Sequence, residues 1–187
     1  RVSRTKEVID LAFDLGVKII TTHIGIVPDD RDAIEWKLLL QSLPEVGDYA
    51  ANKGILLATE TGPEPAEILK KLLVELNNPG IMVNYDPANL VMVAGDDPVE
   101  GVYTLKDYIA HTHAKDGIKL PDENGKKRWK ELPLGEGNVN FPEYLKAMKN
   151  IGFDGFFTIE REVGENPEAD IVKARDFLKS LAAKLNY

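Results

Sequence analysis

Two hydrophobic patterns alternate along the chain. Segments with apolar residues three or four positions apart predict amphipathic helices, and short, nearly continuous apolar runs predict buried strands. In the first repeat, a helical stripe is ended by Gly16 and is followed by the β-rich run VKIITTH. The stripe consists of Val8, Leu11, Ala12 and Leu15.

The same pair of patterns recurs four more times. Helices are predicted over residues 34–52, 65–76, 98–106 and 140–150, and they lead into the runs ILLATE, IMVNYD, YIAHTH and GFFTIE. A final helix opens at Asn166 and Pro167. Helices that alternate with buried strands predict right-handed βαβ units and a parallel sheet covered by helices. The sequence therefore predicts one α/β domain over residues 1–187, with five strands and six helices.

The predicted strands end in residues that can carry chemistry. In a parallel α/β barrel the carboxyl ends of all strands open on one face, where the active site lies. Neighbouring strands are ~4.8 Å apart, so inward-pointing side chains at these ends should converge. An isolated strand-end residue is usually a helix cap or a turn residue, but here every strand follows the pattern at the same end. The converging residues are His23, Glu60, Asp86, His113 and Glu160.

Composition narrows the chemistry of such a site. The chain has no cysteine, which excludes disulfides, thiolate metal sites and a cysteine nucleophile. Any metal must therefore be held by oxygen and imidazole ligands. The net charge of −8 argues against a nucleic-acid partner and favours a small substrate. There is no Gly-x-Gly-x-x-Gly or Gly-x-x-x-x-Gly-Lys motif to indicate nucleotide binding.

The sequence predicts no membrane-spanning or export segment. No apolar stretch approaches the ~20 residues that span a bilayer, and the opening RVSRTKEVID lacks the apolar core of a signal peptide. We therefore expect a cytoplasmic protein without a membrane partner.

Several motifs resemble the xylose isomerase-like TIM barrel family, which includes sugar phosphate isomerases and epimerases, ketose 3-epimerases and the more distant endonuclease IV. They are the strand ends ATETG, NYDPANL, HTHAKD and FTIERE, together with LGEGNVNFPEYLKAMKNIGFDG. That family forms an eight-stranded (β/α)8 barrel, and the match begins before its fourth strand. The resemblance implies a partial barrel, strands 4 to 8 with their helices. Strands 1 to 3 would be absent from this chain, and the missing N-terminal segment or a homo-oligomer would cover the open edge.

The resemblance also implies a metal site. It maps four metal ligands onto Glu60, Asp86, His113 and Glu160, and a mostly carboxylate site with one imidazole suits Mn²⁺, with Mg²⁺, Co²⁺ or Zn²⁺ as alternatives. In the family, proton abstraction next to a carbonyl proceeds through a metal-stabilised enediolate. Glu60 and Glu160 would be the catalytic pair, and the protein a sugar or sugar phosphate isomerase or epimerase.

Substrate-binding residues are expected around these ligands. Asn89 and Lys119 stand where the ketose 3-epimerases have a histidine and an arginine, and Lys for Arg loses a planar hydrogen-bonding fork. The stretch 114–136 is long enough to be a lid loop. Its Lys115 and Lys119 either form solvated surface or bind a phosphate or carboxylate of the substrate.

The remaining candidates have supporting roles. His23 and His111 are expected near the substrate, although His23 is equally well explained as core filler. His111 lies one step deeper than His113 and is expected beside the metal rather than on it. Glu162 is expected behind the ligands, and Glu136 is expected to fix its loop by hydrogen bonds.

Three other functions stay open. A dehydratase or eliminase acting on a keto-sugar or keto-inositol would use the same site. An endonuclease IV-like nuclease needs extra metal ligands at positions that hold Asn89, Trp129 and Glu131 here, so it is disfavoured. Finally, the chain as it stands could be an inactive fragment or an assembly partner, because three strands of the pocket wall would be absent.

Overall fold

The fold is half of a parallel α/β barrel. The computed structural model describes residues 1–187. Its five-stranded parallel sheet has the order β1-β2-β3-β4-β7, so strands that follow one another in the chain lie side by side. The strands are β1 (Ile19–Thr22), β2 (Leu56–Glu60), β3 (Ile81–Tyr85), β4 (Ile109–Ala114) and β7 (Phe157–Ile159). This arrangement confirms the predicted partial barrel.

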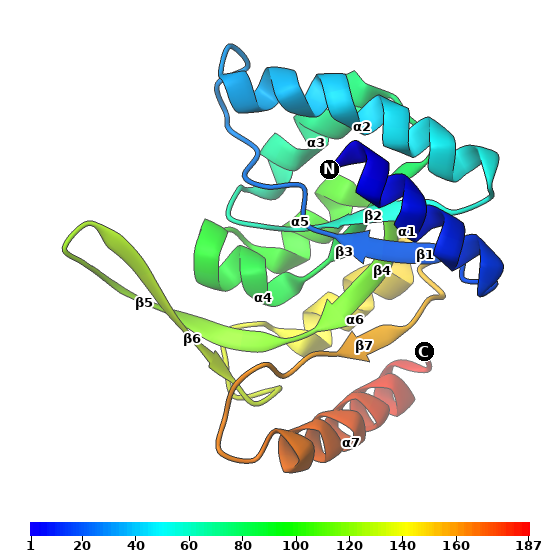
Figure 1. Ribbon diagram of the computed structural model, residues 1–187. Helices are drawn as coiled ribbons and strands as arrows, with labels where there is room; N and C mark the ends of the chain where they lie inside the picture. The colour runs from blue at the N-terminus through cyan, green and yellow to red at the C-terminus, as the bar shows by residue number, and fades with distance from the viewer.

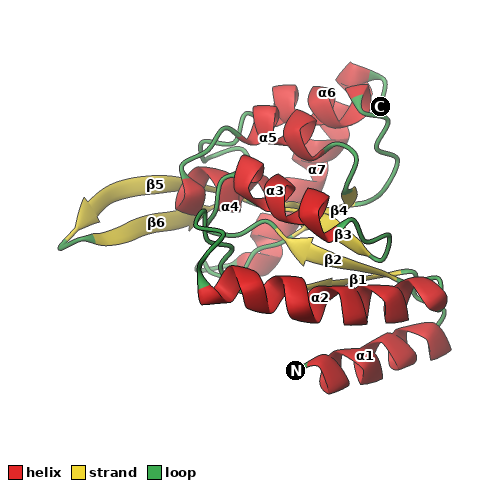
Figure 2. Ribbon diagram, turned by 90° about the horizontal axis from the view of Figure 1, so that it is seen from above, coloured by secondary structure: helices red, strands yellow, loops and turns green.

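Helices between the strands cover one side of this sheet, and α1 and α7 lie at its two edges (Figures 1 and 2). The core lies between the sheet and the apolar faces of the helices that cover it, which contribute the fully buried side chains of Trp36, Leu72 and Tyr144. The long helices are α1 (Val2–Asp14), α2 (Ile34–Asn52), α3 (Ala66–Leu76), α5 (Pro98–Leu105), α6 (Phe141–Asn150) and α7 (Pro167–Leu185). None of these helices is both long and apolar enough to cross a membrane.

The predicted apolar stripe of the first helix was largely wrong. Helix α1 buries Ile9 and Ala12, whereas Leu11 and Leu15 are more than half exposed. The reason is that α1 packs mainly against α2 and, to a lesser extent, β1, at an edge of the sheet. At the opposite edge Phe156, just before β7, is 83% exposed. Both edges of the half-barrel therefore present apolar surface to solvent.

The stretch after β4 is a β-hairpin rather than the structureless lid that we expected. Strands β5 (Asp116–Glu123) and β6 (Lys126–Leu132) pair in antiparallel fashion. Asn124 and Gly125 both have positive φ angles, 52° and 73°, as a tight two-residue hairpin turn requires. The hairpin projects beyond the carboxyl ends of the sheet, and its tip is solvent-exposed (Figure 1).

Two short elements between β3 and α5 were also not predicted. Helix α4 (Pro87–Asn89) is a single turn, and the π-helical segment η1 (Leu90–Ala94) continues it. The base of the hairpin packs on η1, where Gly117 faces the sulfur of Met92 too closely for any side chain to fit. These contacts fix the root of the hairpin next to the carboxyl ends of the strands.

Candidate metal centre

Four side chains converge at the carboxyl ends of four adjacent strands. Glu60 ends β2, Asp86 follows β3, His113 lies near the end of β4, and Glu160 follows β7. One ligand atom from each residue lies within 4.8 Å of the others. His113 Nδ1 is 3.1 Å from Glu160 Oε2 and 3.7 Å from both Glu60 Oε1 and Asp86 Oδ2. The structure thus brings together the four residues that the sequence indicated.

Two atoms at the centre of this cluster are buried without a hydrogen-bond partner: Asp86 Oδ2 and His113 Nδ1. The other oxygen of Asp86 is engaged, since it accepts hydrogen bonds from the amides of Ala88 and Asn89 at the start of α4. Buried polar atoms are nearly always paired, so unpaired atoms that face one another need an explanation. A cation between them would satisfy both. The donor set, three carboxylates and one imidazole, fits a divalent metal ion.

The charges of the cluster are strongly coupled. Burial alone would lower the pKa of His113, but the neighbouring Asp86, Glu160 and Glu60 carboxylates raise it to about 11. The contact with His113 lowers the pKa of Glu160 to about 2. Burial raises the pKa of Asp86. Without a metal, the positive charge of a protonated His113 therefore offsets the charge of the carboxylates, and a cation at this point would take the place of that proton.

A row of polar side chains lies behind the ligands, and the sequence had indicated only His111 among them. Asn84 is fully buried, and its Nδ2 lies 3.2 Å from His113 Nε2 and 3.4 Å from Glu60 Oε2. Its Oδ1 lies 2.8 Å from His111 Nδ1, and His111 Nε2 lies 3.0 Å from Thr158 Oγ1. His111 therefore stands beside the metal cluster and outside it, and burial lowers its pKa. Asn84 precedes Asp86 by two residues, so strand alternation could have placed both on the inner face.

Lys115 is a buried ion-pair partner rather than a solvated surface residue. Its amine lies 2.6 Å from Glu162 Oε2 and 3.1 Å from Glu160 Oε2, with Glu131 at 3.8 Å. Although burial would lower its pKa, the carboxylates around it raise the pKa of Lys115. Glu162, expected behind the ligands, meets Glu160 through this lysine.

The ion pairs continue away from the site through Arg161. Its guanidinium donates to Glu131 Oε1 at 2.7 Å and to Asp170 Oδ2 at 2.9 Å. Glu131 belongs to the hairpin and Asp170 to α7, so Arg161 joins both elements to the segment after β7. Both cations of this network are thus committed to carboxylates of the protein.

The expected substrate-binding residues lie in different surroundings. Asn89 donates hydrogen bonds to Glu60 Oε1 at 2.9 Å and to the Thr61 carbonyl at 3.0 Å, so it holds a candidate ligand. The His23 side chain is 71% exposed, and its Nε2 lies 3.5 Å from Glu60 Oε2, so His23 is no core filler. Lys119 is exposed on the hairpin, with its amine beside Gly95.

Asp116, rather than Glu136, holds the Gly-Glu-Gly turn. The Asp116 carboxylate accepts hydrogen bonds from the amides of Gly135, Gly137 and Val139 at 2.9 to 3.1 Å. A side chain at Gly137 would collide with this carboxylate, which explains the glycine. Glu136 itself points into solvent. This contact could have been suspected from the sequence, since the Asp of HAKD and the Gly-Glu-Gly turn both belong to the motifs noted there.

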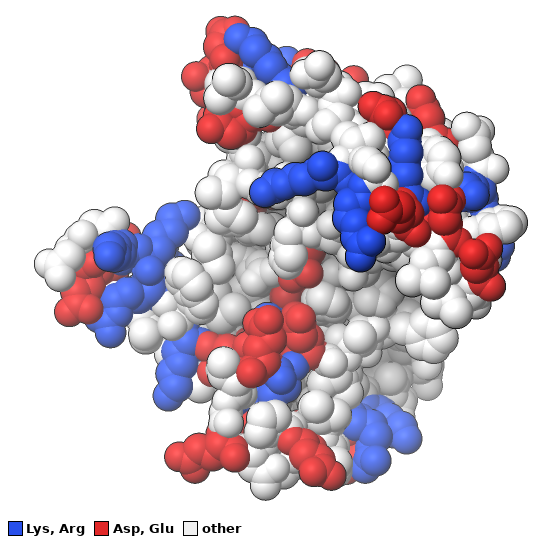
Figure 3. Space-filling view, viewed as in Figure 1, with Lys and Arg blue, Asp and Glu red and all other residues white.

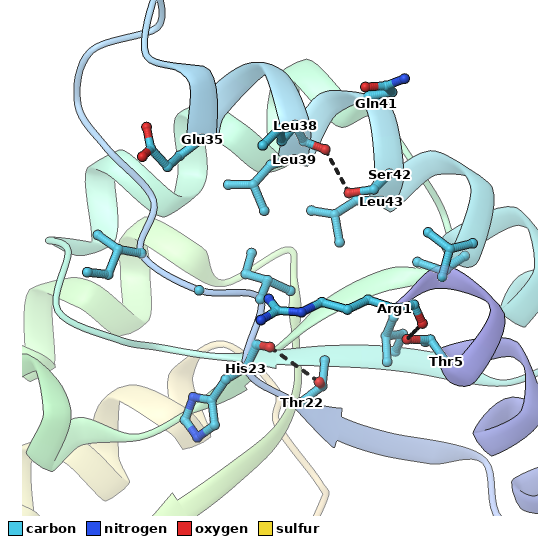
Figure 4. Close-up of a pocket in the computed structure, with 16 residues that line it drawn as sticks. Arg1, Thr5, Thr22, His23, Glu35, Leu38, Leu39, Gln41, Ser42 and Leu43 are labelled. Carbon is cyan, nitrogen blue, oxygen red and sulfur yellow. Dashed lines mark hydrogen bonds between the residues drawn. The ribbon is translucent and has the colours of Figure 1, made fainter.

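A cavity of about 490 Å³ lies apart from the metal cluster, between α1, α2 and the segment after β1. Its walls include Leu38, Leu39 and Leu43 of α2 (Figure 4). His23 contributes to the lining, but its ring points away from these leucines. The cavity lies at the open β1 edge of the sheet. Elsewhere on this face, acidic side chains gather near its centre and basic ones lie along the hairpin (Figure 3).

This fold and this cluster define a class: parallel α/β barrels with a carboxylate-imidazole metal site at the carboxyl ends of their strands. Residues 1–181 match the family described as xylose isomerase-like TIM barrel. The chain belongs to this family, which confirms the resemblance inferred from its strand-end motifs.

Similar proteins include a crystal structure and two enzymes. The crystal structure of a xylose isomerase domain protein from Planctomyces limnophilus is 32% identical with a TM-score of 0.89, and the match covers 98% of this chain and 64% of that one. The L-ribulose-5-phosphate 3-epimerase UlaE of Salmonella paratyphi A is 30% identical, over 96% of this chain and 63% of the relative. An inosose dehydratase of Geobacillus thermodenitrificans is 26% identical, over 78% and 54%. The aligned regions thus cover 54% to 64% of these relatives.

Proposed function

We propose that this protein is a divalent-metal-dependent epimerase or isomerase of a small polyhydroxy carbonyl compound, working within a completed barrel. The observation that carries the proposal is the convergence of Glu60, Asp86, His113 and Glu160 around two buried, unpartnered atoms. The similarity to an L-ribulose-5-phosphate 3-epimerase supports it.

Completion of the barrel is part of the proposal. The sheet has five strands, and a barrel of this class has eight, so three more strands must bridge β7 and β1. The exposed apolar residues at both edges favour such a cover. It would come either from a preceding segment or from another copy of the protein.

The metal would be held by the four converging residues, with Mn²⁺ as the first choice and Mg²⁺, Co²⁺ or Zn²⁺ as alternatives. When bound, a divalent cation supplies the positive charge that polarises the carbonyl of the substrate and acidifies the adjacent carbon. Asn89 orients Glu60, and Lys115 orients Glu160. These contacts keep both carboxylates in place as substrate enters.

Glu60 and Glu160 are the proposed acid/base pair. They come from β2 and β7, which lie on either side of β3 and β4, so they can approach a bound substrate from opposite sides. One carboxylate removes the proton beside the carbonyl, and the other delivers a proton to the opposite face. His23 and Asn89 lie against Glu60 and are positioned to contact the substrate hydroxyls.

The substrate is proposed to be a free sugar rather than a sugar phosphate. In TIM barrels, phosphate groups are often bound by the loops that follow strands 7 and 8. Here those loops contribute Glu131 and Glu162, and their buried cations, Lys115 and Arg161, are already paired with carboxylates. A phosphate at this point would compete with the protein's own carboxylates. A preference for phosphorylated over free sugars would contradict this part of the proposal.

Deuterium exchange tests the proposal. The Mn²⁺-loaded protein is incubated in D₂O with a panel of keto-sugars, and NMR follows deuterium incorporation at the carbon next to the carbonyl. We expect incorporation by the wild type and its loss in Glu60→Gln and Glu160→Gln. Glu143→Gln, an exposed change at the start of α6, serves as the control and should behave as wild type. Unchanged exchange in both active-site variants would refute the assignment.

A dehydratase is the second candidate, because an inosose dehydratase is among the relatives. Both reactions begin with removal of the same proton. They differ in the next step, since a dehydratase expels water from the substrate while an epimerase returns a proton to the same carbon. Incubation with a keto-inositol in D₂O, followed by mass spectrometry, separates them: loss of water identifies the dehydratase, and a mass that changes only by the incorporated deuterium identifies the epimerase.

A further inference from the structure

We infer that Asn84 is a positioning residue of the metal centre, whose side-chain amide fixes the ring orientation and tautomer of both His113 and His111. The inference rests on the proposed metal-dependent function. Asn84 lies one residue before the carboxyl end of β3 with no exposed surface, and the metal cluster does not include it.

Geometry fixes which nitrogen of His113 meets the cation. Nδ1 faces the three carboxylates, whereas Nε2 points back to the Asn84 amide at 3.2 Å. A neutral imidazole that uses Nδ1 as a ligand carries its proton on Nε2. That N–H needs an acceptor, because ligating histidines almost always donate their second ring N–H to a neighbouring group. The amide of Asn84 is the group at this position.

The Asn84 amide oxygen must therefore face His113. In the structure the nitrogen occupies this place, but a half-turn of the terminal amide exchanges the two atoms, and hydrogen-bond chemistry decides between the orientations. With Oδ1 turned to His113, Nδ2 faces His111 Nδ1 and donates to it. The half-turn replaces the 3.4 Å contact between Nδ2 and Glu60 by an amide oxygen that faces this carboxylate, a repulsion that a cation held by Glu60 offsets. Glu60 retains Asn89 as a closer donor at 2.9 Å.

The donor and acceptor of every hydrogen bond in this row of side chains then follow. Since His111 Nδ1 accepts from Asn84, the proton of neutral His111 lies on Nε2, where Thr158 Oγ1 stands 3.0 Å away as the acceptor. Hydrogen bonds thus run in one direction from His113 to Asn84, and separately from Asn84 through His111 to Thr158. Only a side chain that accepts and donates without carrying charge fits between two imidazoles at this buried point.

An Asn84→Asp variant gives a sharp signature. A carboxylate accepts from both neighbours and donates to neither, so His113 keeps its Nε2–H bond while the proton of His111 moves from Nε2 to Nδ1. The chain has three histidines, so ¹⁵N imidazole spectra are simple to assign. We expect the Mg²⁺-loaded wild type at pH 8 to show the Nε2–H tautomer of His111 and Asn84→Asp to show the Nδ1–H tautomer. A general loss of stability would not produce this exchange. An Nδ1–H tautomer in the wild type would overturn the inference.

Metal affinity provides the second readout. Loss of a group that orients a metal ligand typically weakens metal binding by about 10- to 100-fold, and we expect this range for Mn²⁺ in Asn84→Leu by calorimetry. Thr59→Val, which removes a buried hydroxyl without a hydrogen-bond partner on the neighbouring strand, is the matched control and should bind as wild type. Equal affinities of wild type and Asn84→Leu would overturn the inference about Asn84 but would leave the proposed function intact. If the wild type bound neither Mn²⁺ nor Mg²⁺, the proposed function itself would fail.

Discussion

Above the acid range, metal affinity should depend on pH mainly through His113. In the metal-free protein its pKa is about 11, whereas that of Glu160 is about 2. At neutral pH the site therefore holds one proton that a metal must displace. Binding should weaken about tenfold for each unit by which pH falls, which amounts to roughly a thousandfold between pH 9 and pH 6. Burial raises the pKa of Asp86, so the dependence should steepen at the acid end.

Calorimetric titration with Mn²⁺ measures this directly. In buffers with different heats of ionisation, we expect release of about one proton per metal ion near pH 8. His113→Gln is the control: it should bind more weakly and lose the slope, because the displaced proton is gone. A wild-type affinity that is flat over this pH range would refute the reasoning, since no proton would then compete with the metal.

The same shift has a consequence for the metal-free fold. The folded pKa of His113 lies above its ordinary value of 6.5. Its contribution to stability is therefore fully present below pH 6.5 and is lost as the pH rises toward about 11. Metal binding and this proton stabilise the cluster as alternatives, and high pH should favour the metal-bound form.

Three further predictions concern stability. Lys115→Met should lower the free energy of unfolding by about 1–3 kcal/mol in urea titrations, because the part-buried Glu160 and the buried Glu131 lose a cation, whereas the pair with the exposed Glu162 adds little; an unchanged midpoint would contradict the network. Asp116→Ala should cost about 1–3 kcal/mol, because the amides of the Gly-Glu-Gly turn lose their acceptor, and faster amide hydrogen exchange confined to residues 135–139 is the expected readout. Saturating Mn²⁺ should raise the unfolding temperature in a concentration-dependent way, and a chelator should reverse the rise, whereas an unaltered temperature would argue against binding to the native state.

The order of helices and strands could be predicted from the sequence because each repeat carries its own period and its own stop signal. The metal cluster could be predicted because parallel topology brings strand ends together, whatever the distance between Glu60 and Glu160 along the chain. The hairpin was missed although Asn124-Gly125 is a strong turn signal, since the surrounding charged residues were interpreted as a loop. The local sequence pattern was sufficient to predict this hairpin.

Other features depend on contacts that no local pattern reveals. Lys115 is charged and follows a strand, which is typical of a substrate contact, but Glu160 and Glu162 lie against it after more than forty intervening residues. Asn84 is one amide in an apolar run, and its position between His111 and His113 depends on the register of β3 against β4. Likewise, the exposed side of α1 depends on which elements lie next to it. These are tertiary effects, and they became visible only in the assembled sheet.

Anomalous diffraction from crystals grown with Mn²⁺ tests the central claim most directly. The account predicts one strong manganese peak, in contact with His113 Nδ1 and with carboxylate oxygens of Glu60, Asp86 and Glu160. That peak should be absent in crystals of Asp86→Asn grown in the same way. A peak elsewhere in the molecule, or no peak at saturating Mn²⁺, would contradict the account.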